Sequence, residues 1–125
     1  LLGRAPLARL WPAIPKRAGS DVRDPEMRRL NPCMEVMPLQ AVGELGRFQG
    51  EVDRLLPRVR APALVVVGGE DHTVARAGAE RLAARIGSGP ARLLVLPESW
   101  HLVGIDVERE RCAEEVRRFL ESIPA

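Results

Sequence analysis

The stretch VVVGGEDHTV, residues Val65–Val74, changes character in its middle. It begins with three valines, an apolar run of the kind that forms a buried strand, and the run ends at Gly68–Gly69. The charged and polar residues Glu70–His72 follow at once. Functional groups often lie where a rigid strand ends and a loop begins. Two alternatives therefore arise for this loop, a catalytic acid or a polar turn.

Outward from this stretch, the sequence predicts an α/β fold. Residues 63–69 and 91–97 (ALVVVGG and ARLLVLP) are apolar without alternation, as strands buried on both faces are. Helical spacing between them is shown by Ala75, Ala79, Leu82, Ala83 and Ile86. A closing helix carries on one face Cys112, Val116, Phe119, Leu120 and Ile123. The order strand, helix, strand, helix predicts parallel strands in a right-handed βαβ unit.

The N-terminal part has a different pattern. Six of the eleven prolines fall within residues 1–38, which predicts short helical pieces and loops. Residues 16–29, KRAGSDVRDPEMRR, are predicted to form an exposed charged connector. From Leu39 to Leu56 apolar residues recur at steps of three or four, which predicts an amphipathic helix after Pro38. We therefore divide the chain into residues 1–57 and a β-α-β-α part, residues 58–125.

Composition excludes several classes of protein. The 125 residues carry 19 basic and 17 acidic side chains, a balance that does not favour nucleic acid or an acidic membrane surface as a partner. No apolar run reaches the roughly 18 residues of a membrane helix. Arginine and proline interrupt the opening LLGRAPLARLW, so no signal peptide is predicted and a cytoplasmic location is expected. The chain lacks an initiator Met, and we expect it to be cut from something longer.

Cysteine and histidine are scarce. Cys33 and Cys112 lie far apart without a CxxC pair, which favours two buried free thiols over a disulfide. With only two histidines and no cysteine cluster, a structural zinc site is not expected.

Two loops follow the predicted strands at what should be the same edge of a parallel sheet. One carries Asp71 and the other carries His101. Functional groups of parallel α/β sheets collect beyond the carboxyl ends of the strands. If the strands are neighbours, the Asp71 carboxylate could accept a hydrogen bond from the His101 imidazole. Such a bond would fix the tautomer of the histidine and stabilise its protonated form, as a general base requires.

These residues carry a resemblance to a known family. APALVVVGGEDHTV followed by LLVLPESWHLVGID resembles the C-terminal part of α/β hydrolases, and most closely the bacterial carboxylesterases and monoacylglycerol lipases. The motif is G-x-x-D-x-x-V after one strand and S-x-H after the next. The resemblance covers about residues 34–123 and more loosely the rest. It implies the last two parallel strands with flanking helices, preceded by part of a helical cap within residues 1–57.

The resemblance also implies roles for single residues. Asp71 matches the acid of the catalytic triad and His101 its base, while Asp106 matches an acid with a structural role. The implied activity is hydrolysis of small acyl esters by a serine hydrolase, without metal or organic cofactor. The nucleophile elbow G-x-S-x-G is absent, since none of the serines stands in such a motif: Ser20, Ser88, Ser99 and Ser122. The chain is therefore expected to supply acid and base only, and to be inactive alone.

Alternatives to this interpretation remain. A peptidase or lactonase of the same fold would use the same triad, and an inactive remnant or interaction module would lack the nucleophile. Among single residues, Glu70 is expected to point into solvent, and the side chain of His72 to diverge from Asp71. Trp100 is expected to pack rather than to contact substrate. Three residues could line an acyl pocket, although core packing is favoured: Met34, Met37 and Leu39.

Overall fold

The computed structural model describes residues 12–16, 19–89 and 91–124. The opening stretch, for which we predict no signal peptide, lies outside the described residues. The contacts divide the chain into two compact units. The first comprises the described parts of Leu1–Ser20 and Pro32–Leu55, and the second those of Asp21–Asn31 and Leu56–Ala125. The predicted division after residue 57 differs from these units mainly in residues 21–31, which cluster with the strands.

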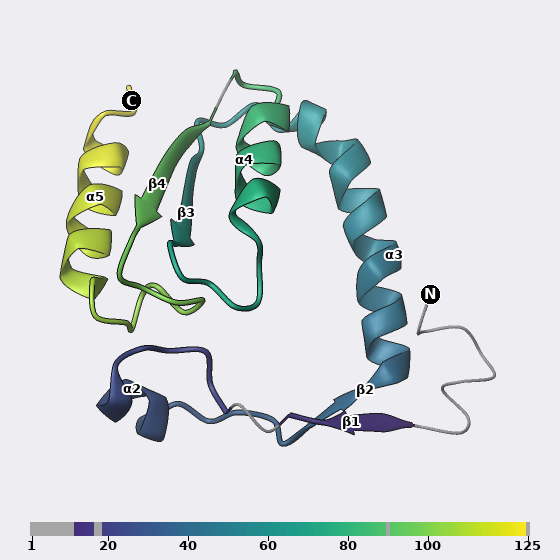
Figure 1. Ribbon diagram of the computed structural model, residues 1–125. Coiled ribbons are helices and arrows are strands. Elements are labelled where there is room, and N and C mark those ends of the chain that lie inside the picture. The colour runs from purple at the N-terminus through teal and green to yellow at the C-terminus, as the bar shows by residue number, and fades with distance from the viewer. Residues whose placement is uncertain (1–11, 17–18, 90, 125) are drawn as a thin grey trace. The chain divides into compact units, whose positions relative to one another are not determined.

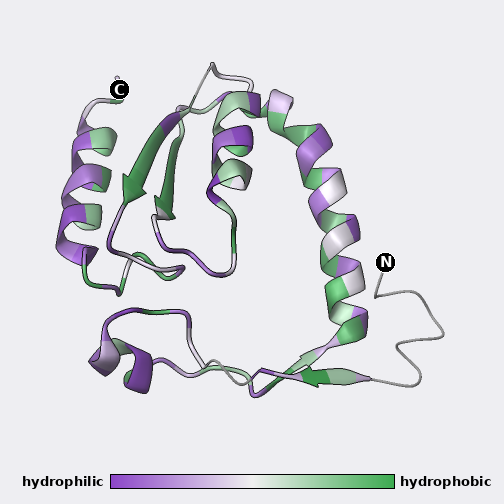
Figure 2. Ribbon diagram, in the orientation of Figure 1, coloured by the Kyte–Doolittle hydropathy of each residue, from purple (hydrophilic) through white to green (hydrophobic). Residues whose placement is uncertain are grey.

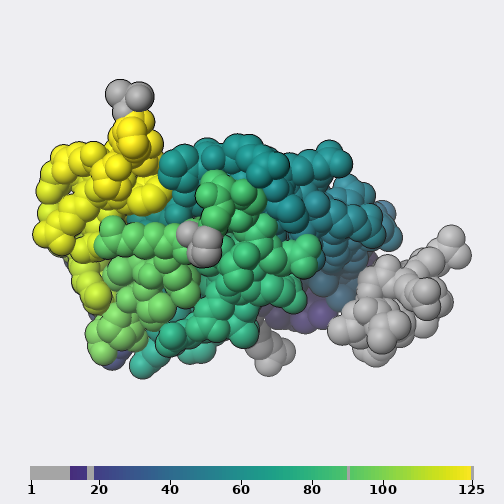
Figure 3. Space-filling model, turned by 90° about the horizontal axis from the view of Figure 1, so that it is seen from above, coloured from purple at the N-terminus to yellow at the C-terminus, as the bar shows by residue number. Residues whose placement is uncertain are grey.

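The second unit contains the predicted strand, helix, strand, helix order (Figure 1). Strand β3, Leu64–Gly68, pairs in parallel with β4, Arg92–Leu96. Helix α4, Arg76–Arg85, connects them, and α5, Arg109–Glu121, follows. The two helices lie on opposite sides of the strand pair, and the space-filling view shows α5 (yellow) and the green β4 region as one continuous surface (Figures 1 and 3). The predicted parallel pairing is confirmed.

Small residues let α4 approach the sheet closely. The buried residues of this helix are Ala79 and Ala83, and Ile86 at its end is buried too. Val67 and Leu96 of the strands and Cys112 of α5 are buried as well. Strands β3 and β4 are apolar apart from Arg92 at the start of β4, whereas the helices carry polar residues on their outer faces (Figure 2). Leu120, predicted on the apolar face of α5, is instead 61% exposed.

The segment Asp21–Asn31 contains helix α2, Pro25–Leu30. Asp24 caps this helix, since its side chain accepts the N–H groups of Glu26 and Met27, and proline stands at the first helical position. The prediction of an exposed connector is wrong for Val22, which is 0% exposed. An apolar side chain that is buried in this way anchors the charged residues around it to the second unit.

The first unit contains two strands that the sequence did not predict. Strands β1, Ala13–Pro15, and β2, Val36–Pro38, form an antiparallel pair of three residues each. A two-stranded ribbon has only edges, where proline is tolerated because its missing N–H costs no ladder bond. Helix α3, Leu39–Leu55, follows as predicted, and the second unit resumes with the 3₁₀ turn η1, Leu56–Arg58.

Most apolar side chains of the first unit are exposed. The prediction of core packing is confirmed for Leu39, which is 5% exposed. It is wrong for Met34 and Met37, which are 70% and 41% exposed. On α3 the side chains of Leu45 and Phe48 are also more than half exposed. The helical period was predicted correctly, but the burial of its apolar side was not.

Both cysteines are free thiols, as predicted. Cys112 is buried, and burial raises the pKa of its thiol, whereas Cys33 is only half-buried. Among the described residues, no helix is long and apolar enough to cross a membrane.

Candidate functional site

The loops after β3 and β4 lie side by side. Gly68 pairs with Leu96 in the parallel register, so both strands end at the same level. Beyond that point the Gly69 N–H donates to the Leu96 carbonyl at 2.7 Å, and the Glu70 N–H donates to the Ser99 carbonyl at 3.2 Å. These two main-chain bonds hold the loops together past the end of the sheet.

The two glycines are required by this close approach. An ideal Cβ on Gly68 would lie 2.1 Å from the carbonyl oxygen of Trp100 and 2.5 Å from that of Ser99. A Cβ on Gly69 would lie 2.6 Å from Cα of Pro97. Any larger residue would force the loops apart. The apolar run therefore stops at Gly68–Gly69 because the second loop occupies the space of a side chain.

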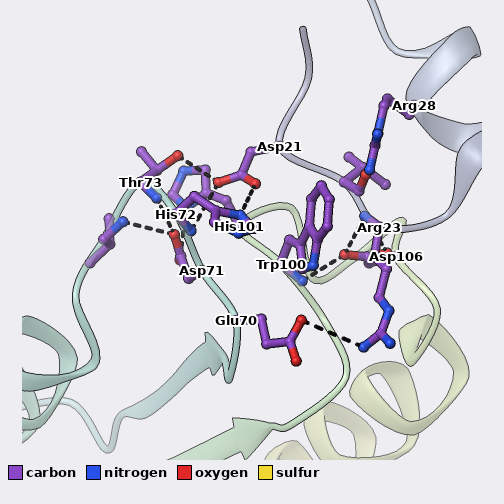
Figure 4. A network of polar contacts seen from close by, with 12 residues as sticks. Asp21, Arg23, Arg28, Glu70, Asp71, His72, Thr73, Trp100, His101 and Asp106 are labelled. Carbon is purple, nitrogen blue, oxygen red and sulfur yellow. Dashed lines mark hydrogen bonds and ion pairs between the residues drawn. The ribbon is translucent and has the colours of Figure 1, made fainter. Parts of the chain in front are cut away.

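The structure brings the two predicted site residues together. The His101 Nδ1 atom lies 3.0 Å from Asp71 Oδ2 (Figure 4). The Asp71 side chain is 5% exposed and that of His101 is 35% exposed. The second carboxylate oxygen, Asp71 Oδ1, accepts the N–H groups of Thr73 and Val74, each at 2.7 Å. One oxygen of Asp71 thus closes a turn, and the other contacts the histidine.

The electrostatics of the pair keep Asp71 ionised. Burial raises the pKa of its carboxyl, but hydrogen bonds from the Val74 N–H, the His101 ring and the Thr73 N–H outweigh burial. The pKa therefore lies below its ordinary value. An ionised carboxylate can only accept a hydrogen bond, so the proton between the two groups belongs to His101 Nδ1. Nε2 is then the ring nitrogen that can accept a proton.

His72 turns to a different carboxylate. Its Nδ1 atom lies 2.9 Å from Asp21 Oδ1, and its main-chain N–H donates to Asp21 Oδ2 at 3.2 Å (Figure 4). Thr73 donates its hydroxyl to the same oxygen at 2.8 Å. The side chain of His72 diverges from Asp71, as predicted, and is 61% exposed. Glu70 is 57% exposed, also as predicted, with its carboxylate 3.8 Å from the Arg23 guanidinium.

Trp100 and Asp106 lie beside the pair. The guanidinium carbon of Arg28 lies 4.5 Å from the centroid of a Trp100 ring, and the His72 ring meets the indole at 86° with centroids 4.6 Å apart. These contacts agree with the packing role predicted for Trp100. Asp106 is completely buried, at 0% exposure, and its carboxylate accepts main-chain amides.

Sequence reasoning missed the residues that the segment Asp21–Asn31 contributes. Asp21, Arg23 and Arg28 contact the two loops, with Arg23 donating to the Glu98 carboxylate at 2.7 Å. These partners stand 51 to 75 residues apart in sequence, so no local spacing points to them. The buried Val22 between charged residues was the one signal that this connector packs against something.

Two of the four serines direct their hydroxyls to other partners. Ser99 is 0% exposed and donates its hydroxyl to Glu108 at 3.0 Å, and Ser122 donates its hydroxyl to the Phe119 carbonyl at 2.7 Å. Within the described ranges, no group of three His, Cys, Asp or Glu side chains is placed to hold a metal ion.

Comparison with known proteins agrees with this architecture. The parallel strands and their helices match part of the α/β-hydrolase fold. The chain belongs to the family described as serine aminopeptidase, S33, whose model matches residues 8–108. The resemblance to hydrolases of the monoacylglycerol lipase kind that the sequence indicated is confirmed.

Individual relatives are lipolytic enzymes. A thermostable monoacylglycerol lipase from Bacillus sp. (strain H-257) is 28% identical over 101 residues, which are 81% of this chain and 40% of the relative. A solved structure from work on the metagenome-derived lipolytic enzymes LipS and LipT has a TM-score of 0.78 and 29% identity, over 90% of this chain and 44% of that one. The monoacylglycerol lipase of Paleococcus ferrophilus shares the fold, with a TM-score of 0.68 at 17% identity, over 92% of this chain and 49% of that one. This chain thus spans less than half the length of these relatives.

Gly68→Ala should destabilise the protein that carries this sequence. The new methyl group would meet the Trp100 carbonyl, a main-chain atom that cannot move without its loop. We expect a loss of about 3 kcal/mol in the free energy of unfolding, measured in urea, as for overpacked cores. Gly104→Ala is the matched control, because a Cβ there meets nothing within 4 Å. Equal stability of the two variants would contradict the close-approach explanation.

Proposed function

We propose that this chain forms the C-terminal part of a serine hydrolase of carboxylic esters, with Asp71 as the acid of the triad and His101 as its base. The observation that carries the proposal is the 3.0 Å contact between His101 Nδ1 and Asp71 Oδ2 at the carboxyl ends of adjacent parallel strands. In α/β hydrolases the triad members follow the order Ser, acid, His along the chain. Asp71 and His101 stand in that order.

In the proposed reaction His101 Nε2 takes the proton of a serine hydroxyl as its oxygen attacks the ester carbonyl. Asp71 keeps the proton on Nδ1 and stabilises the imidazolium that forms. His101 then gives the proton to the leaving alcohol, and water releases the acyl group by the same route in reverse. The sequence contains no G-x-S-x-G elbow. The serine and the oxyanion donors would therefore come from outside this chain, in the intact hydrolase, by which we mean the whole protein that contains it.

The proposed substrates are small acyl esters. Two lipolytic relatives at 28% and 29% identity favour esters of fatty acids. The family's description as serine aminopeptidase favours a second candidate, hydrolysis of a peptide bond at an N-terminus. Both reactions use a serine acylated with the help of a histidine and an acid, so the pair at the strand ends fits either.

Substrate comparison in the intact hydrolase tests this proposal. We expect p-nitrophenyl butyrate to be hydrolysed with kcat/KM about 100-fold or more above that of alanine p-nitroanilide, because specificity follows from differential binding of the transition state. A fluorophosphonate probe should label one serine outside this chain. Preference for the anilide would favour the aminopeptidase. Labelling of Ser20, Ser88, Ser99 or Ser122 would refute an external nucleophile.

A further inference from the structure

The carboxylate of Asp106 is enclosed by main-chain amides. Its Oδ1 atom accepts the N–H groups of Arg23 and Asp24 at 2.9 Å each, and that of Val107 at 2.8 Å. Its Oδ2 atom accepts the Trp100 N–H at 2.7 Å, the shortest of these bonds, and also shares the Arg23 N–H at 3.1 Å. Burial raises the pKa of this carboxyl, but the four amides outweigh burial and hold the pKa below its ordinary value. Asp106 is thus a buried anion that is neutralised by backbone dipoles.

The four amides come from three separate parts of the chain. Arg23 and Asp24 belong to the segment Asp21–Asn31 and stand 83 and 82 residues before Asp106. Trp100 belongs to the loop after β4. The carboxylate therefore holds a distant segment and this loop at the same point.

Trp100 is the residue directly before His101, and its peptide groups are constrained on two sides. Its N–H is bound by Asp106, and its carbonyl oxygen occupies the space beside Gly68. That carbonyl belongs to the peptide group that joins Trp100 to His101. Rotation there would swing the imidazole away from Asp71, and a shift of about 1 Å at a reacting group can cost roughly 100-fold in rate.

We propose that Asp106 is a positioning residue for His101, acting through the Trp100 N–H, an inference that rests on the proposed function. The carboxylate fixes the backbone that sets the His101–Asp71 distance. Asp106 does not touch the reacting atoms. Its role differs from general support of the fold, because its shortest hydrogen bond is made with the residue adjoining the base.

Asp106→Asn in the intact hydrolase is the first test. If Asn keeps its oxygen toward Arg23, Asp24 and Val107, its NH₂ group faces the Trp100 N–H, and two donors then oppose each other. We expect kcat to fall about 100-fold with KM within twofold, since the lost interaction acts on orientation. Rates should be measured well below the melting temperature. A kcat within threefold of wild type in a folded variant would overturn the proposal.

Glu108→Gln is the matched control. Glu108 also accepts groups of the loop after β4, namely the Glu98 N–H at 2.8 Å and the Ser99 hydroxyl at 3.0 Å, and is 13% exposed. Its bonds do not reach Trp100 or His101. We expect a comparable loss of thermal stability with kcat within threefold. If Glu108→Gln loses as much kcat as Asp106→Asn, Asp106 has only a structural role.

A spectroscopic measurement separates this inference from the proposed function. The proton on His101 Nδ1 should give a downfield ¹H signal in ¹⁵N-histidine-labelled protein, assigned by its loss in His101→Gln. The signal should broaden or move upfield in Asp106→Asn and persist in Glu108→Gln, whether or not esters are the substrate. An unchanged signal in Asp106→Asn would overturn the positioning role.

A second variant covers failure of Asp106→Asn to fold. Replacing the Ser99–Trp100 peptide bond by an ester removes the Trp100 N–H and leaves the carboxylate of Asp106 and its other three amides in place. The change also weakens the Ser99 carbonyl as an acceptor for the Glu70 N–H, a bond of 3.2 Å that is the longer of the two between the loops. The same losses of kcat and of the His101 signal are expected. Wild-type values for both would overturn the proposal.

Discussion

His101→Ala should lower kcat of the intact hydrolase by roughly 10⁴- to 10⁶-fold, the range found when triad members are removed from serine proteases. His72→Ala should cost less than about tenfold, because His72 lies outside the proposed reaction path. The two histidines share one kind of contact, since each places Nδ1 within 3.0 Å of an aspartate carboxylate. They differ in position, since His72 follows β3 and His101 follows β4.

The comparison depends on geometry. His101 follows β4, and its ring is 35% exposed with Nδ1 directed at a nearly buried acid. His72 is 61% exposed and directs Nδ1 to Asp21, in the segment before α2. The measurement is kcat for hydrolysis of p-nitrophenyl butyrate, with circular dichroism to show that both variants fold. If His72→Ala is inactive and His101→Ala is active, the assignment of the base is wrong.

Asp71→Asn should be the second large loss, roughly 10⁴-fold in kcat, as for the same change in a serine protease. The amide oxygen can keep the bonds to the Thr73 and Val74 N–H groups, so the turn survives. The NH₂ group would then face His101 Nδ1 and donate to it. That reverses the tautomer and puts the proton on Nε2, where a general base must have none.

Asp21→Asn is the control for this prediction. Asp21 contacts His72 at 2.9 Å and accepts the Thr73 hydroxyl, much as Asp71 serves its own partners. We expect kcat within tenfold of wild type for this variant. Equal kcat in Asp71→Asn and Asp21→Asn would show that Asp71 is only a turn residue.

The lowered pKa of Asp71 also predicts how the stability of the fold changes as the pH falls. Because the folded-state pKa is lowered, the ionised form is favoured by folding. The stabilisation from this group is present above the unfolded value of about 3.9 and is lost as the pH falls through the folded pKa. Asp71 should therefore stay charged over the pH range in which esterases are assayed.

The strands and the Asp71–His101 contact were predictable because the signals are local. Each strand contains an uninterrupted apolar run, and parallel pairing places both following loops at one edge. The order of elements alone was enough to place His101 near Asp71. The reason why the first apolar run ends in glycine was not predictable, because it is the close contact between Gly68 and the second loop.

Other parts of the fold were not predictable for physical reasons. Strands β1 and β2 have three residues each and include proline, so neither the periodicity nor the composition of a strand develops. The contacts of Asp21 and Arg23 depend on partners far along the chain. The exposure of Phe48, at 62%, shows that a helical period predicts the helix but not what covers it.

The order in which the chain visits its two units has a consequence for evolution. The chain leaves the second unit after Asn31 and returns to it at Leu56. The segment Pro32–Leu55, which belongs to the first unit, is thus an insertion between two parts of the second. Lengthening a connection costs little, about 0.6 kcal/mol for each doubling of a flexible loop. Insertions and deletions within residues 32–55 can therefore accumulate at little cost to the second unit. The loops that carry Asp71 and His101 need not change with them.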